Sequence, residues 1–310
     1  MKQTSKRLVA ALLAGLLALS LTACGGGGGA SSKEVVLYDG NYSEMQLIHQ
    51  MVKLLVEKNT DLTVTIKDEM SNVNAFRELT ADPPASDLVN SYDGTLLTTF
   101  LKQDPADVPE GKSLYEYTNE QAMKEYNIRM LDLLGTDNTY AIAVPETIAA
   151  QYKLEKVSDL IPVAGELVFG AEHEFFTEEG SMKYGPFVKF YGLNFKDKVS
   201  VDIGLKYAAI ENASFQVTEV YATDGLNRKA GLKILEDDLH FFPEYNGALL
   251  VRDDLFARVA ETAPNLEEVL NQLGGIFTNE IMTDLTYAVD VEGRPVAEVA
   301  TEFLQKQGLL

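Results

Sequence analysis

From residue 34 onward, short apolar segments with strand character alternate with amphipathic segments with helix character. The strand-like segments span residues 34–38, 62–66, 87–89, 140–144, 166–169, 215–221 and 247–251. The helix-like segments span residues 43–58, 95–102, 120–134, 202–211, 253–261, 266–273, 279–287 and 294–306, with a shorter helix around Phe76 and Leu79. Repeated alternation of strand and helix predicts an α/β fold in which helices pack on sheets.

Local signals define some of these boundaries. Ser43 is the expected N-cap of the first long helix, and Leu47 and Met51 then share one helix face. A turn is expected at Asp93-Gly94, and Pro145 fits the first turn of the helix that follows it. The chain has 310 residues, no internal repeat and no polar linker after Ser32. We therefore expect two lobes joined by extended crossings rather than two separate domains.

The N-terminal segment has the pattern of an export signal. A basic start with Lys2, Lys6 and Arg7 precedes an apolar run over residues 9–21, which is short for a membrane span. The run ends in Leu21-Thr22-Ala23-Cys24, which resembles the lipobox of bacterial lipoproteins. We predict a signal peptide over residues 1–23 and lipidation of Cys24. The alternative is an ordinary cleaved signal followed by an incidental cysteine.

Cys24 is the only cysteine in the chain, so an intrachain disulfide is impossible and a metal–thiolate cluster is excluded. Five glycines follow it, and residues 24–33 are predicted to form a flexible tether. No later apolar run approaches the length of a membrane span. We therefore expect a folded body anchored by lipid at the extracytoplasmic face of a bacterial cell membrane.

Composition and motifs exclude several functions. The formal net charge is −21, and such a surface repels nucleic acid and anionic lipid headgroups. The three histidines form no metal-binding pair, and no nucleophile elbow is present. Glu236-Asp237-Asp238 is interpreted as a solvated acidic turn rather than a calcium site, and Glu172 and Glu174 beside His173 as a polar loop rather than an acid–base pair. We predict no catalytic residues, no metal and no cofactor, and hence not an enzyme.

Several segments, in order from about Val35 to Leu310, match the motifs of one known protein family. Tyr92-Asp93-Gly94-Thr95 is similar to the family's Tyr-Thr-Gly-Thr. Residues 170–175 are similar to Gly-Ala-x-x-Glu-Phe, and residues 221–225 to Tyr-x-Thr-Asp-Gly. The most specific match is Phe241-Phe242-Pro243-Glu244-Tyr245-Asn246, which follows the acidic turn. By these motifs the chain resembles the substrate-binding proteins of glycine betaine, carnitine and choline ABC importers.

The resemblance implies a two-lobed periplasmic-binding-protein fold of type II with the ligand in the cleft between the lobes. Lobe 1 would comprise residues 34–138 and 243–310, and lobe 2 residues 139–242. It also implies an aromatic cage for a quaternary ammonium, with Asp93 and Thr95 beside it. The cage residues are Tyr92 and Tyr245 from lobe 1, and Tyr140 and Tyr221 from lobe 2. The alternative is that these four, among 14 tyrosines, are core or surface residues.

Departures from the family pattern bear on the ligand. Gly40 stands where members that hold a carboxylate have lysine, and Met45 replaces a glutamine. Thr177 and Glu178 stand where an arginine is common, and Asp93 replaces a threonine. Loss of two cationic anchors favours choline, or another cation without a carboxylate, over betaine or carnitine.

We expect a monomer that delivers its ligand to an ABC permease. Three alternatives remain. The same fold could bind a sulfur-containing or aromatic betaine, or the chain could be a sensor or adhesion lipoprotein with a degenerate cleft. The third alternative, a hydrolase, is the least favoured, because no nucleophile–base pair is visible.

Overall fold

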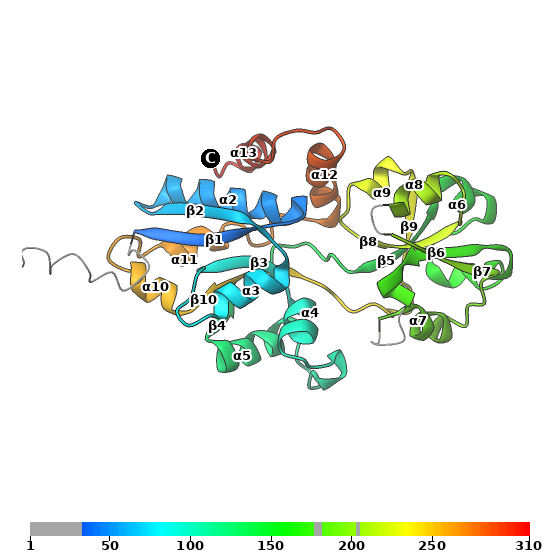
Figure 1. The fold of residues 1–310 in the computed structure, drawn as a ribbon, viewed down its shortest axis with the longest axis horizontal. Coiled ribbons are helices and arrows are strands. Elements are labelled where there is room, and N and C mark those ends of the chain that lie inside the picture. The colour runs from blue at the N-terminus through cyan, green and yellow to red at the C-terminus, as the bar shows by residue number, and fades with distance from the viewer. Residues whose placement is uncertain (1–32, 177–181, 203–204) are drawn as a thin grey trace, which may run out of the picture.

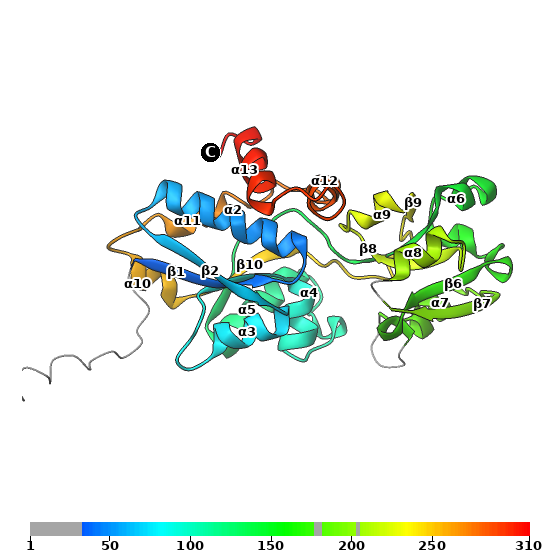
Figure 2. The ribbon, with the colours of Figure 1, turned by 45° about the horizontal axis from the view of Figure 1, so that its top comes forward.

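The computed structural model describes residues 33–176, 182–202 and 205–310. Its elements form two lobes joined by two extended segments, as Figures 1 and 2 show from two directions. Within the described residues, no helix combines the length and apolar character needed to cross a membrane. The predicted signal peptide, Cys24 and the tether up to Ser32 lie outside the described residues, as do Thr177 and Glu178.

The first lobe contains two small sheets with helices around them. Its N-terminal part comprises β1 (Glu34–Gly40), α2 (Ser43–Asn59), β2 (Thr63–Met70), α3 (Asn72–Thr80), β3 (Leu88–Tyr92), α4 (Asp93–Thr95), α5 (Leu114–Tyr126) and β4 (Ile128–Met130). The chain returns to it with β10 (Gly247–Arg252), α10 (Asp254–Val259), α11 (Leu266–Asn271), α12 (Asn279–Asp290) and α13 (Val296–Lys306). Strands β1 and β2 pair in parallel, whereas β10 lies between β3 and β4 and is antiparallel to both.

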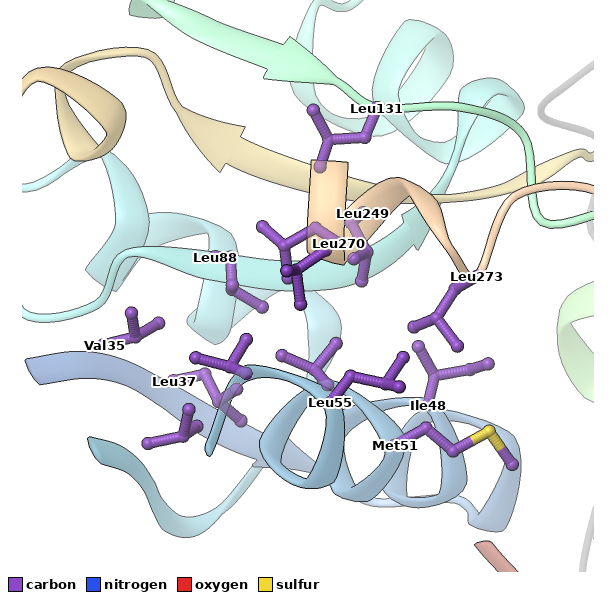
Figure 3. Close-up of a cluster of buried hydrophobic side chains, with 14 of the residues drawn as sticks. Val35, Leu37, Ile48, Met51, Leu55, Leu88, Leu131, Leu249, Leu270 and Leu273 are labelled. Atoms are coloured by element: carbon purple, nitrogen blue, oxygen red, sulfur yellow. The ribbon is translucent and has the colours of Figure 1, made fainter. Parts of the chain in front are cut away.

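Helix α2 supplies one side of the main core of this lobe. Leu47, Met51 and Leu55 recur at spacings of four residues, so they lie on one helix face, and all are fully buried. Figure 3 shows this face packed against side chains from the strands and from α11. The labelled residues of the cluster are Val35, Leu37, Ile48, Met51, Leu55, Leu88, Leu131, Leu249, Leu270 and Leu273.

The second lobe is built on one mixed sheet with the strand order β7-β6-β8-β5-β9. Its elements are β5 (Tyr140–Pro145), α6 (Glu146–Tyr152), β6 (Val168–Glu172), α7 (Tyr184–Tyr191), β7 (Asp197–Val201), α8 (Lys206–Glu211), β8 (Val217–Tyr221), α9 (Leu226–Lys229) and β9 (Leu232–Leu235). Strand β5 is antiparallel to both β8 and β9, while β6 is parallel to β7 and β8. Three fully buried rings, those of Phe169, Phe175 and Phe187, anchor its core.

The two crossing segments lie side by side between the lobes. Asp137 and Asn246 form an antiparallel bridge, and the Asn138 amide donates to the Tyr245 carbonyl at 3.0 Å. The Gly247 amide likewise donates to the Thr136 carbonyl at 3.0 Å. Paired crossings of this kind can serve as a hinge between rigid lobes. The exact lobe boundaries given above stay a prediction.

The α/β fold class is confirmed, but several local predictions were wrong. The helix expected over residues 120–134 begins at Leu114 and ends at Tyr126, because Asn127 adopts the left-handed conformation that caps a helix. Residues 128–130 then form β4 against β10. Ser43 is not the N-cap of α2: Tyr42 holds that position, and the Ser43 hydroxyl donates to Asp290 at 2.6 Å. Asp93-Gly94 opens a helical segment rather than a turn.

Candidate functional site

Two adjoining cavities of about 620 Å³ and 200 Å³ lie where the lobes meet. They share four lining residues, Thr95, Asn138, Tyr221 and Tyr245, and so form one continuous recess. Tyr92 lines the larger cavity and Tyr140 the smaller one. The further lining residues are Asn41, Tyr42, Ser43, Glu44, Thr139, Met182, Thr223, Asp224, Leu226, Thr286 and Asp290. The structure therefore brings the four sequence-predicted tyrosines and Thr95 to the same recess.

The two tyrosines of the second lobe are cross-strand neighbours. Strands β5 and β8 are antiparallel, and their register sets Tyr140 directly opposite Tyr221. Their ring centroids are 5.2 Å apart with a tilt of 40° between the planes, a spacing typical of contacting aromatic pairs. Phe175 and Phe242 support the Tyr140 ring edge-on at 5.7 Å and 6.2 Å. The pair is thus a rigid wall fixed by sheet pairing and core packing.

The two tyrosines of the first lobe lie on neighbouring strand ends. Tyr92 closes β3 opposite Gly247, and Tyr245 lies just before β10, so their ring centroids are 6.1 Å apart. Gly94 allows the Tyr245 ring to approach the backbone, since a Cβ at this position would lie 2.1 Å from Tyr245 Cε2. The absence of a side chain at residue 94 therefore shapes this wall.

Asp93 is fully buried but does not line the recess. Its Oδ1 accepts from the backbone amides of Gly94 at 2.7 Å and Asn246 at 2.9 Å, and its Oδ2 accepts from Asn246 Nδ2 at 2.9 Å. Burial raises the pKa of Asp93 to about 6, although these hydrogen bonds lower it. Its contacts fix the loop that carries Tyr245.

Glu44 is a lining residue that the sequence reasoning missed. It is buried, and its Oε1 accepts from the Tyr92 hydroxyl at 2.8 Å. Its Oε2 accepts from the Thr223 hydroxyl of the second lobe at 2.6 Å, so the carboxyl group bridges the two lobes. Burial raises the pKa of Glu44. Spacing could have revealed this residue, because Glu44 shares the buried face of α2 with Ile48 and Met51.

The phenol rings of Tyr92, Tyr140 and Tyr221 stay neutral. Burial raises the pKa of Tyr92, Tyr140 and Tyr221, and nearby negative groups add to the rise. A neutral ring presents the negative face of its quadrupole, which attracts cations. No lysine or arginine belongs to the described lining, and Lys183 Nζ lies 5.9 Å from the Tyr140 ring centroid. In the described ranges, no group of histidine, cysteine or acidic residues is arranged to hold a metal.

Comparisons with known proteins agree with this architecture. A family model described as the substrate-binding domain of ABC-type glycine betaine transport systems matches residues 33–306. The carnitine transport binding protein OpuCC of Listeria monocytogenes is 31% identical over 288 residues, which cover 93% of this chain and 90% of that protein. The ergothioneine transport permease/binding protein EgtU of Helicobacter pylori is 31% identical over 223 residues. That match covers 72% of this chain, which spans only 38% of the length of EgtU.

Solved structures show the same fold. A crystal structure described as a glycine betaine/carnitine/choline ABC transporter superposes with a TM-score of 0.80 at 29% identity, covering 89% of this chain and 98% of that one. Ligand-free YehZ of Escherichia coli superposes with a TM-score of 0.73 at 21% identity. The predicted periplasmic-binding-protein fold is therefore confirmed.

Proposed function

Because the chain belongs to the family of substrate-binding domains of ABC-type glycine betaine transport systems, we propose that it captures choline or a closely related quaternary-ammonium compound. It is a transport binding protein and not an enzyme. The single observation that carries the proposal is the recess lined by Tyr92, Tyr140, Tyr221 and Tyr245.

The chemistry of a quaternary ammonium suits these rings. Such a cation has no N–H to donate, so a carboxylate is a poor hydrogen-bonding partner for it, whereas aromatic faces attract it directly. A desolvated contact between a cation and a ring contributes roughly 1–2 kcal/mol, so four contacts give at most about 8 kcal/mol. A ligand with a micromolar Kd binds with about this free energy. The cost of immobilising the ligand must be subtracted from the sum of the contacts. Because the rings come from both lobes, closure of the lobes is part of binding.

The charges of the recess favour a ligand without a carboxylate. Its described lining contains Glu44, Asp224 and Asp290 but no basic residue. A betaine carboxylate would find hydroxyl and amide donors such as Thr95 and Asn138, but no ion-pair partner among these lining residues. Choline has a hydroxyl in place of the betaine carboxylate, and a hydroxyl can both donate and accept hydrogen bonds.

A second candidate ligand class is favoured by the size of the recess. A cavity of about 620 Å³ is in the range of drug-sized ligands and exceeds the needs of choline alone. A larger betaine would contact the rings and also the part of the recess lined by Glu44, Asp224 and Asp290. Ergothioneine is such a compound, because it joins a trimethylammonium group to a sulfur-bearing imidazole, and it is named in the relative EgtU.

Calorimetric titration with choline, glycine betaine, carnitine and ergothioneine tests the proposal. We expect choline to bind more tightly than glycine betaine, and Tyr140→Ala to weaken its binding more than tenfold. Tyr117→Ala is the matched control, because Tyr117 lies on α5 away from the recess lining. Tightest binding of ergothioneine would select the second ligand class. Silence toward all four compounds, or full affinity in Tyr140→Ala, would overturn the cage.

We also propose that lipid on Cys24 holds the protein at the extracytoplasmic membrane face, where it serves an ABC permease. The lipobox-like Leu21-Thr22-Ala23-Cys24 supports this location. Cys24→Ser is expected to move the protein from the membrane fraction to the soluble fraction of the producing cells. Retention of that variant in the membrane fraction would refute the anchor.

A further inference from the structure

A buried cluster of three charged residues lies in the second lobe. Lys206 on α8 is fully buried, and its Nζ is 3.5 Å from Glu219 Oε2 on β8 and 3.8 Å from Glu172 Oε2 on β6. One ammonium therefore faces two carboxyl groups, which are also buried. Glu219 Oε1 and Glu172 Oε2 accept no hydrogen bond from the described residues. Two buried carboxyl groups thus face a single buried ammonium, an arrangement that is unfavourable for stability.

The cluster is in direct contact with the aromatic wall of the recess. The Tyr221 hydroxyl donates to Glu172 Oε1 at 3.3 Å, and Lys206 Nζ lies 5.5 Å from the Tyr221 ring centroid. Glu219 lies two residues before Tyr221 on β8, so both side chains leave the same face of the sheet. Tyr221 in turn contacts Tyr140. The charges thus lie immediately beside the rings that line the recess.

We propose that Glu172, Lys206 and Glu219 act as positioning residues that orient Tyr221 and set the electrostatic potential of the cage toward a permanently positive ligand. The proposal rests on the proposed function. With both carboxylates ionised the cluster carries a net charge of −1, which attracts a cation across the rings. With one carboxyl group protonated its net charge is zero, and that attraction is lost.

The surroundings of the cluster determine where this change occurs. In the described chain, the charged and titratable groups that face it from the elements packed around it are Tyr140 on β5, Tyr207 on α8, Tyr221 on β8, Asp224 after β8, and Lys183 before α7. Burial raises the pKa of Glu219 to about 7; the Lys206 ammonium opposes this rise and Glu172 adds to it. Asp224 accepts from the Tyr207 hydroxyl at 2.5 Å.

The sign of the pH effect follows. The raised pKa of Glu219, about 7, means that the cluster becomes more negative by one charge as the pH rises through this value. A quaternary ammonium does not titrate, so any change in its affinity reports on the protein. Affinity for such a cation should therefore rise from pH 6 to pH 8. A neutral molecule of the same shape should show no such rise.

The experiment compares choline with its neutral carbon isostere, 3,3-dimethylbutan-1-ol, by titration into the full protein at pH 6 and pH 8. We expect choline to bind about fivefold more tightly at pH 8, the effect of one buried charge acting over several ångströms in a medium of moderate dielectric constant. The isostere should bind equally at both values. Glu219→Gln should flatten the choline profile and weaken binding at pH 8. Glu155→Gln is the matched control, since Glu155 is an exposed residue of the same lobe.

The outcomes separate this inference from the function on which it rests. Choline binding that is independent of pH, or a pH effect shared by the isostere, overturns the charge cluster and leaves the proposed function standing. An unchanged pH profile in Glu219→Gln also overturns it. Silence toward all four quaternary-ammonium compounds overturns the proposed function, and this inference with it. If another of the four binds and choline does not, the pH comparison is made with the compound that binds. If Glu219→Gln fails to fold, Glu172→Gln takes its place: because Glu172 raises the pKa of Glu219, this variant should move the rise in choline affinity to lower pH, and an unmoved rise overturns the inference.

Discussion

Gly94→Ala perturbs the cage although it replaces none of the four tyrosines. The added methyl group acts by displacing the Tyr245 ring. The added Cβ would lie 2.1 Å from Tyr245 Cε2 and 2.3 Å from its Cδ2. Non-bonded carbons settle at about 3.5–4.0 Å, so the Tyr245 ring must move by about 1.5 Å. Gly94 belongs to the short helix α4 and has no positive φ, so alanine suits the backbone itself. The damage is therefore confined to the ring.

The magnitude follows from the loss of one wall of the cage. A cation–π contact at a desolvated site contributes about 1–2 kcal/mol, so Gly94→Ala should weaken choline binding by about 5- to 30-fold. Calorimetry measures the affinity, and thermal unfolding checks that the fold is kept. Gly185→Ala is the control, because a Cβ on this helical glycine of α7 meets no atom within 4 Å. That variant should bind normally.

A double-mutant cycle gives the decisive result. Once the Tyr245 ring is removed, the alanine methyl at residue 94 has room, so Gly94→Ala combined with Tyr245→Ala should bind no more weakly than Tyr245→Ala alone. Two results would refute the reasoning. One is normal affinity in Gly94→Ala. The other is an additional tenfold loss in the double variant, which would mean that residue 94 acts by a route other than Tyr245.

Two further predictions concern the buried carboxyl groups. Thr223→Val removes the hydrogen bond from the second lobe to Glu44 and leaves a buried acceptor short of a partner, at a cost of about 1–3 kcal/mol. Ligand dissociation measured by stopped flow should accelerate at least threefold, whereas Thr301→Val, whose hydroxyl bonds only within α13, should change nothing. The unfolding free energy of the ligand-free protein should fall by about 4 kcal/mol from pH 5 to pH 7.5, because a carboxyl pKa raised by folding favours the folded state only while the group is protonated. Burial raises the pKa of Glu219 from 4.5 to about 7 and that of Asp93 from 3.8 to about 6. Denaturant titrations at the two pH values measure the change, and stability that rises over this interval would contradict the assignment.

Much of the fold could be predicted because its longer elements carry a clear period. Helix α2 and strands β1, β5 and β10 lie close to where the apolar pattern set them. The short elements β4, β7 and β9 were not predicted. Strand β7 has the pattern of a partly exposed edge strand, and β4 has three residues that become a strand only by pairing with β10. Such segments depend on tertiary partners, which a local pattern does not contain.

The candidate site could be predicted where the residue chosen from a motif is also the residue whose side chain lines the recess. Tyr92, Tyr140, Tyr221 and Tyr245 could be chosen from motifs, and β-sheet register then accounts for the Tyr140–Tyr221 contact. Asp93 was chosen by the same adjacency to a tyrosine, but adjacency does not fix direction. Its carboxylate is directed to Asn246 and the Gly94 amide, where it holds the loop that carries Tyr245.

The acidic groups around the rings illustrate why the rest could not be predicted. Glu44, Glu172 and Glu219 come from three elements that are far apart in the sequence, α2, β6 and β8, and no motif marks any of them. Their effect on a bound cation depends on burial, because the Coulomb energy between two charges is much larger in a medium of low dielectric constant than in water. Glu44 joins the lobes through Thr223, while Glu172 contacts Tyr221. Each tyrosine ring attracts any quaternary ammonium through the same quadrupole, so the rings alone discriminate weakly between such cations. Selectivity for one cation over another is therefore expected to depend on these buried acids as much as on the rings.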